Sequence, residues 1–174
     1  SNLPPKPVDS ISESTLVTKY IAPIIQAYVD DDVVTSDFPN TTQKRQGLKA
    51  DRPDIRAMAF DREICWGEMT GLTQETNTAK NQWGTYRLAR FGKVFLDEGH
   101  SMAPLIQVTH SHGSYFRLST KTRGLMLLEE AGTFVISTIT AMIPSLFATI
   151  PTLLIAKTDI HTIANGDLSG LKRS

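Results

Sequence analysis

Two acidic residues on an expected β-hairpin constrain this chain more than any other feature. Residues 54–60 and 63–68 are apolar, partly alternating runs, and a short polar turn at 61–62 separates them. This pattern predicts two antiparallel strands joined by a tight turn. Asp54 begins the first run and Glu68 ends the second. Antiparallel pairing brings these two ends together, so the sequence predicts neighbouring carboxylates.

A pair of neighbouring carboxylates can hold one hard divalent cation. Mg²⁺ or Mn²⁺ prefers oxygen ligands, and it can activate a water molecule while it neutralises phosphoryl oxygens. These are the two requirements of phosphodiester hydrolysis, with Asp54, Glu68 and the backbone carbonyl of Met69 as the expected ligands. Pro53 and Gly67, which directly precede the two acids, indicate a shaped backbone, although turns explain them too. The alternative is that both acids are solvent-facing charges at the edge of a sheet.

Glu13 is a third candidate metal ligand, on an amphipathic helix expected over residues 10–29. It shares the apolar face with Val17 and therefore points inward, where a carboxylate needs a partner or a metal. The competing interpretation is a capping box of Ser10 and Glu13, in which the carboxylate only folds back on the helix N-terminus. Pro23 is expected to kink or divide this helix.

A basic and aromatic helix is expected from about Lys80 to Leu96, after a polar loop over 71–79. One face is apolar, and the rest of the helix carries Lys80, Trp83, Tyr86, Arg87, Arg90 and Lys93. Basic side chains interleaved with aromatic ones suit contact with a phosphate backbone and with exposed bases. The alternative is a helix whose aromatic residues belong to the core and whose basic residues simply meet water.

The remaining segments are expected to complete a central sheet covered by helices, in the order α-β-β-α-β-β-(β)-α. The expected elements are a loop over 33–50 with a short strand near its end, a hairpin of 104–110 and 114–119, short strands at 124–130 and 133–136, and a helix over 141–156. We expect one domain over residues 10–157, between a flexible lead-in at 1–9 and a polar tail at 158–174. The length of 174 residues suits a single domain.

Composition limits the class of protein less than the acids do. The 18 basic and 18 acidic residues cancel, so any nucleic-acid-binding surface has to be a local patch. The single cysteine, Cys65, excludes an internal disulfide and fits a reducing compartment. No apolar signal segment is visible near the start, and an intracellular location in the nucleus or the cytoplasm is expected.

Residues 131–156 carry no charge at all. A run of this length approaches the roughly 20 apolar residues that span a bilayer. Several Ser and Thr residues dilute it, however, and Pro144 and Pro151 interrupt it. We therefore expect a strand followed by a buried helix, which could also supply a homodimer surface, and we do not expect a membrane segment.

Three stretches together resemble the PD-(D/E)XK, or restriction-endonuclease-like, nuclease superfamily. They are Pro53-Asp54-Ile55-Arg56, the run from Ile64 to Thr70, and the helix from Lys80 to Phe91. More narrowly, the chain is similar to the nuclease-like domains of fungal and oomycete Crinkler-type proteins, over about residues 10–155. The start of the first helix resembles that group as well.

The resemblance implies an α/β fold with a central mixed β-sheet flanked by helices, an αβββαβ-type core. It also implies dependence on Mg²⁺ or Mn²⁺, cleavage of nucleic acid with DNA preferred over RNA, and a neighbouring kinase-like or other domain in a longer native chain. Asp54 and Glu68 match the two motif acids, and Glu13 matches the helical acid of some members. Thr70 stands where the family has a lysine that serves the attacking water. In such folds the next helix can supply this lysine, which makes Lys80 the candidate here.

Two functions follow from these observations. The first is a nuclease in which Glu13, Asp54 and Glu68 hold the metal and Lys80 serves the water. Arg87, Arg90 and Lys93 then contact backbone phosphates. The second is a catalytically inactive nuclease-fold module that serves protein interaction or regulation, as the missing lysine and the zero net charge suggest.

Overall fold

The computed structural model describes residues 13–39, 53–70, 78–122, 124–136 and 145–171. Within these ranges the chain forms an α/β fold around a six-stranded mixed sheet with the strand order β1-β2-β3-β4-β5-β6. The strands are β1 (Val34–Asp37), β2 (Ile55–Ala59), β3 (Arg62–Thr70), β4 (Met102–Thr109), β5 (His112–Thr122) and β6 (Leu125–Val135). Neighbouring strands are antiparallel except β3 and β4, which run parallel.

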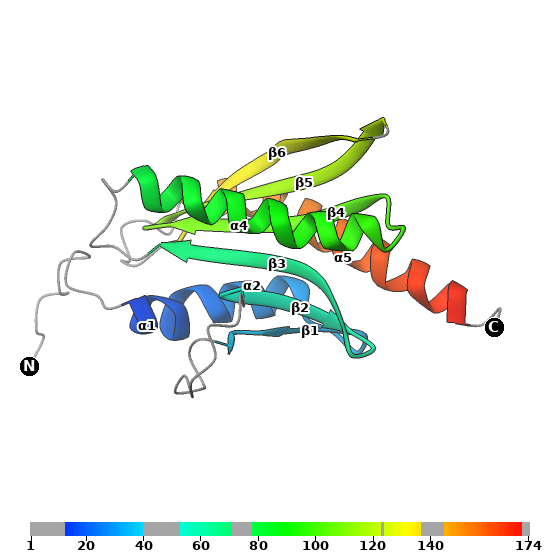
Figure 1. Ribbon diagram of the computed structural model, residues 1–174. Helices are drawn as coiled ribbons and strands as arrows, with labels where there is room; N and C mark the ends of the chain where they lie inside the picture. Colours follow the sequence, from blue (N-terminus) through cyan, green and yellow to red (C-terminus); the bar gives the residue numbers. More distant parts are fainter. Residues whose placement is uncertain (1–12, 40–52, 71–77, 123, 137–144, 172–174) are drawn as a thin grey trace, which may run out of the picture.

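Helices cover both faces of this sheet (Figure 1). Helix α4 (Thr78–Asp97) connects the parallel strands β3 and β4 and packs on both of them. On the opposite face, α5 (Ser145–Leu171) packs against β6 and against α2 (Ala22–Val29). Parallel neighbours need such a crossover, because a tight turn cannot join strands that point the same way.

The first helix is divided, as Pro23 predicts. A short α1 (Glu13–Leu16) continues as a π-helical turn, η2 (Val17–Ile21), before α2 begins with Pro23 in its first turn. Proline has no backbone N–H, and the N–H groups in the first turn of a helix need no partner within the helix. Pro23 therefore destabilises α2 least in its first turn. Buried residues from all three pieces, such as Leu16, Val17 and Ile25, join the core.

The predicted hairpin of 54–60 and 63–68 is confirmed as β2 and β3, but its turn lies at residues 60–61 and not at 61–62. The predicted helix of 80–96 is confirmed as α4. The hairpin of 104–110 and 114–119 is confirmed as β4 and β5. The predicted lead-in at 1–9 lies outside the described residues, as do most of the loops at 33–50 and 71–79.

Three predicted segments differ from the structure. The start of 33–50, expected as a loop, contains β1, which pairs with β2 and buries Val34 completely; the short strand expected near the end of 33–50 falls outside the described residues. The strands expected at 124–130 and 133–136 are one strand, β6, which follows β5 along its whole length. The polar tail expected from 158 onward is helical as far as Leu171.

The extension of α5 has a packing cause. Ala156, Ile160 and Ala164 recur every four residues and are almost fully buried, so one stripe of the helix continues into the core. Asp159 adds a polar anchor: its carboxylate accepts hydrogen bonds from Tyr115 (2.6 Å) and from Arg117 (2.7 Å) on β5. The buried stripe and the hydrogen bonds of Asp159 together stabilise the helix beyond residue 156.

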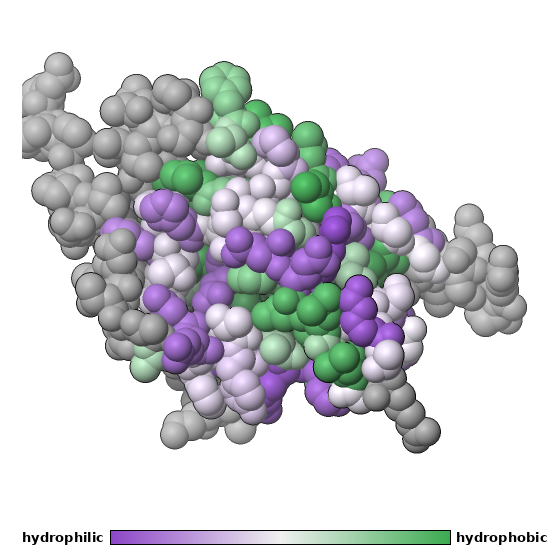
Figure 2. All heavy atoms as spheres, turned by 90° about the horizontal axis from the view of Figure 1, so that it is seen from above, coloured by the Kyte–Doolittle hydropathy of each residue, from purple (hydrophilic) through white to green (hydrophobic). Residues whose placement is uncertain are grey.

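No helix among the described residues has the length and apolar character that a membrane crossing requires. Large hydrophobic side chains are nevertheless exposed on α4, at the start of β6 and on α5. From above, Figure 2 shows green hydrophobic side chains in separate patches between purple hydrophilic ones. Within the segment 131–156, Phe147 and Leu154 are exposed, and a homodimer through this segment stays a prediction.

Candidate functional site

Strand pairing places the two predicted acids side by side. Ile55 pairs with Gly67, and continuing this antiparallel register by one residue sets Asp54 opposite Glu68. The Asp54 N–H donates to the Gly67 carbonyl at 2.9 Å, which holds this end of the ladder together. Both side chains therefore lie on the face of the sheet that α4 covers, because neighbours directly across a ladder share one face.

Gly67 is required by close packing and not by a turn. A Cβ atom at this position would lie 2.8 Å from Ile55 Cβ and 3.2 Å from the Ile106 carbonyl oxygen. Real Cβ atoms do not approach other carbon atoms this closely, so a larger residue would push β2 and β3 apart. The glycine thus allows the tight approach that brings Asp54 next to Glu68.

Asp54 is fixed by the backbone of the neighbouring strand. Its Oδ2 accepts a hydrogen bond from the Met69 N–H at 2.8 Å. Because the N–H and the carbonyl of one strand residue point to the same edge, the Met69 carbonyl is expected on the Asp54 side as well. Two carboxylates and a carbonyl are hard oxygen donors of the kind that Mg²⁺ and Mn²⁺ prefer.

Glu68 is the most deeply buried acid of the site. The residue is only 5 % exposed, and its Oε2 accepts a hydrogen bond from Arg87 Nη1 at 2.7 Å. Arg87 comes from α4, so this ion pair joins the helix to the sheet. A buried carboxylate requires a positive partner, and the guanidinium provides one in the structure as it stands.

Lys80 lies in the same small pocket as the two acids. This acid pocket has a volume of about 160 Å³, and the residues that line it are Asp54, Glu68, Met69, Thr70, Lys80, Trp83, Gly84 and Arg87. Helix α4 therefore brings a lysine to the acids, as the sequence predicts. Thr70, two residues after Glu68, is buried in the pocket wall.

Gln107 on β4 is a site residue that sequence reasoning missed. It pairs with Glu68 across the parallel ladder. Its side chain accepts from Thr85 Oγ1 and donates to the Asn81 carbonyl, both at 2.9 Å. These bonds fix the first half of α4 above the acids. A polar residue inside an otherwise apolar strand was the available signal.

Arg90 and Lys93 do not line the acid pocket. Both are exposed on α4, and Lys93 forms an ion pair with Asp97 one turn later. Trp83 and Tyr86 are more than half exposed, and their ring centroids lie 5.3 Å apart. The aromatic side of the helix therefore faces solvent next to the pocket and does not belong to the core.

The third predicted ligand cannot be placed in the site. Glu13 begins α1, but its side chain lies outside the part that the structure describes, as does its capping partner Ser10. Among the described side chains, no group of three or more His, Cys, Asp or Glu residues is arranged to hold a metal ion. The acids that the structure brings together are thus Asp54 and Glu68.

No family model, curated protein or solved structure matches this chain in the comparisons made. The class of site therefore rests on its own residues and geometry.

Proposed function

We propose that this chain is a metal-dependent nuclease-like domain that binds nucleic acid and hydrolyses its phosphodiesters. The observation that carries the proposal is that Asp54, directly before β2, Glu68 on β3 and Lys80 on α4 line one pocket. The element order from α2 to β4 is helix, three antiparallel strands, helix and parallel strand. This order supports a restriction-endonuclease-like αβββαβ core with the acids at the expected strand ends.

The proposed roles follow from charge. Asp54, Glu68, Lys80 and Arg87 sum to zero, so a bound divalent cation would give the pocket a charge of +2 and an attraction for a phosphodiester. Asp54 and Glu68 would hold Mg²⁺ or Mn²⁺, which would supply an activated water and neutralise the phosphoryl oxygens. Lys80 would orient that water and stabilise the charge that develops in the transition state.

Substrate would reach the pocket along the solvent-facing side of α4. Trp83 and Tyr86 form an exposed aromatic pair beside the pocket, where bases can stack. Arg90 follows on the same helix and is exposed, as a contact to backbone phosphate requires. Lys93 would first have to leave Asp97, which is a modest cost for an exposed ion pair.

The ion pair between Arg87 and Glu68 favours a second candidate function. Arg87 Nη1 lies 2.7 Å from Glu68 Oε2, so the guanidinium already neutralises the buried carboxylate as a metal ion would. Thr70 supplies no charge in the motif position. Both features suit an inactive nuclease-fold module in which Arg87 permanently replaces the cation and the fold serves regulation or protein interaction.

A cleavage assay on the purified chain distinguishes the two functions. Single- and double-stranded DNA and RNA are incubated with Mg²⁺ or Mn²⁺, with the Asp54→Asn variant as the control for contaminating nucleases. Cleavage by the wild type and not by the variant would establish the enzyme. If every substrate stays intact in both metals, the inactive module is the better description.

A further inference from the structure

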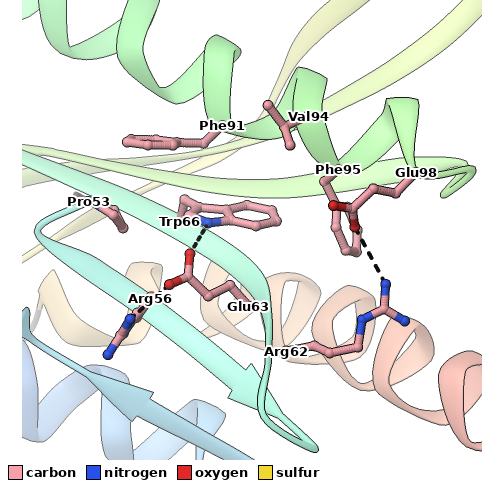
Figure 3. Close-up of a pocket in the computed structure, with 9 residues that line it drawn as sticks. All are labelled: Pro53, Arg56, Arg62, Glu63, Trp66, Phe91, Val94, Phe95 and Glu98. Atoms are coloured by element: carbon pink, nitrogen blue, oxygen red, sulfur yellow. Dashed lines mark hydrogen bonds and ion pairs between the residues drawn. The ribbon is translucent and has the colours of Figure 1, made fainter. Parts of the chain in front are cut away.

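A second, larger pocket adjoins the acid pocket along the seam between α4 and the sheet. Its volume is about 630 Å³, within the range of about 300–1,000 Å³ that is typical of small-molecule sites. Figure 3 shows Phe91 and Val94 reaching down from α4, with Trp66 on β3 below them. We call this the side pocket. Its lining also includes Arg56, Arg62 and Glu63.

The side pocket offers aromatic and apolar surface to a ligand. Phe91 is only partly buried, and Val94 is 60 % exposed although it lines a hollow. Trp66 is nearly buried and is held in place by its indole N–H, which donates to Glu63 Oε2 at 2.8 Å. Phe91 is therefore the ring that can stack on a planar, apolar-faced ligand, and its partial burial leaves little side-chain freedom to be lost.

The rim of the side pocket is polar but carries no net charge. Arg56 is bonded to Asp37 at 2.6 Å and to Glu63 at 2.8 Å. Burial opposes the charged form of Arg56, but these two hydrogen bonds outweigh it and raise the pKa of the guanidinium. Two arginines and two glutamates line the pocket, so their charges cancel. Such a rim suits a neutral ligand with hydrogen-bonding edges and gives no attraction for a phosphate.

The two pockets are lined by neighbouring residues directly before β2, on β3 and on α4. Pro53 lines the side pocket and Asp54 the acid pocket; on β3, Trp66 and Glu68 point to the same face, two residues or about 6.6 Å apart. On α4, Arg87 pairs with Glu68 while its guanidinium carbon lies 5.9 Å from the Phe91 ring centroid. A ligand with one end in each pocket would therefore span about one nucleotide.

We infer that the side pocket receives an unpaired nucleobase of the nucleic-acid strand whose phosphate occupies the acid pocket. This inference rests on the proposed function for the phosphate and adds the substrate class: single-stranded or locally unpaired nucleic acid. A neutral, planar base matches the partly exposed ring of Phe91 and the neutral rim, and the charged phosphate matches the acid pocket once a cation is bound. A base inside a duplex is stacked and paired, so it cannot enter.

The test compares a labelled oligothymidylate with an abasic chain of the same length, which keeps the phosphates and lacks the bases. Fluorescence anisotropy in Ca²⁺ gives a Kd for each, and their ratio isolates the contribution of the bases. The variants are Val94→Glu, which puts a charge on the rim at an exposed position, and Val94→Thr, its nearly isosteric control. Phe91→Leu removes the ring and keeps an apolar side chain.

We expect the wild type to bind the oligothymidylate roughly five- to a hundred-fold more tightly than the abasic chain. Val94→Glu and Phe91→Leu should each lower this ratio several-fold, and Val94→Thr should leave it unchanged. Because the added charge repels the phosphates of both chains equally, its electrostatic effect cancels in the ratio. A ratio near one in the wild type, or one that Val94→Glu and Phe91→Leu leave unchanged, would overturn the inference.

Failure of the proposed function has a different signature. Mn²⁺ binding, measured by calorimetry on the same variants, reports the acid pocket alone. Normal Mn²⁺ binding together with a ratio near one removes the side-pocket inference and leaves the metal site standing. A base-dependent ratio that Val94→Glu abolishes, in a protein that neither binds Mn²⁺ nor cleaves, supports the base pocket and removes the nuclease.

Discussion

Arg87 on α4 donates a hydrogen bond from Nη1 to Oε2 of Glu68 on β3, at 2.7 Å, across the contact between helix and sheet. The two lie 19 positions apart in sequence, and both line the acid pocket. The guanidinium holds a position next to the carboxylate where a divalent cation would also be attracted. Much of what this site can do depends on whether a metal displaces Arg87.

Removal of both acids should abolish metal binding. We expect calorimetry to detect Mn²⁺ binding to the wild type and none to the Asp54→Ala, Glu68→Ala double variant, because two carboxylates supply the charge of the site. Glu129→Ala, which removes an exposed acid on β6, is the matched control and should bind as the wild type does. Unchanged Mn²⁺ binding in the double variant would show that the metal binds at another site.

Replacement of Arg87 by Gln should destabilise the protein by about 1–3 kcal/mol, because Glu68 is then left buried without its guanidinium partner. Mg²⁺ should raise the melting temperature of Arg87→Gln more than that of the wild type, since the cation stabilises only the folded state and no longer competes with Arg87. Differential scanning fluorimetry with and without Mg²⁺ measures both effects.

The control for this experiment is the Glu68→Gln, Arg87→Gln double variant. Without the Glu68 charge, its melting temperature should respond to Mg²⁺ less than that of Arg87→Gln. An equal response of all three proteins would show that Mg²⁺ acts away from the acid pocket.

Lys80→Met should reduce cleavage by about 10²–10³-fold while Mn²⁺ binding persists, since the lysine acts on the water and the transition state and is not a metal ligand. The control Lys80→Arg keeps the charge. Adding Thr70→Lys to Lys80→Met should recover part of the rate, because position 70 lines the same pocket. If Lys80→Met cleaves as fast as the wild type, Lys80 has no role in the reaction.

Tyr115 should make stability depend on pH in the alkaline range. Burial, together with the hydrogen bond to Asp159, raises the pKa of the Tyr115 hydroxyl far above its ordinary value of 10.0. Above about pH 10 the unfolded chain therefore loses this proton while the folded chain keeps it, so the free energy of unfolding falls as pH rises.

The comparison variant for this effect is Tyr115→Phe. At neutral pH it should be less stable than the wild type by about 1 kcal/mol, for the lost hydrogen bond to Asp159. The difference should shrink above pH 10, because only the wild type has this hydroxyl to titrate. Urea unfolding at pH 7 and at pH 10.5 measures it; a constant difference would contradict the assigned role of the Tyr115 proton.

The sequence by itself determined the elements whose patterns are local. Alternating apolar runs around a two-residue turn are enough to predict the β2–β3 hairpin. Asp54 comes opposite Glu68, however, only because a β-bulge between Ala57 and Met58 shifts the pairing by one residue, which the sequence pattern did not predict. The 3.6-residue period of α4 places Lys80 and Arg87 on nearly the same side of the helix. The sequence could therefore predict that basic side chains lie close to the two acids.

Only the tertiary structure decided the features that depend on distant segments. Gln107 enters the site through the parallel pairing of β3 with β4. Helix α5 continues past residue 156 because Tyr115 and Arg117 on β5 hold Asp159 and because Ile160 and Ala164 are buried. Arg87 is directed to Glu68 by the packing of α4 on the sheet, and not by its own helix. The side pocket likewise exists only because α4 packs beside β2 and β3, which supply its lining together. Such contacts arise from the pairing and packing of whole elements, which no local pattern of residues encodes.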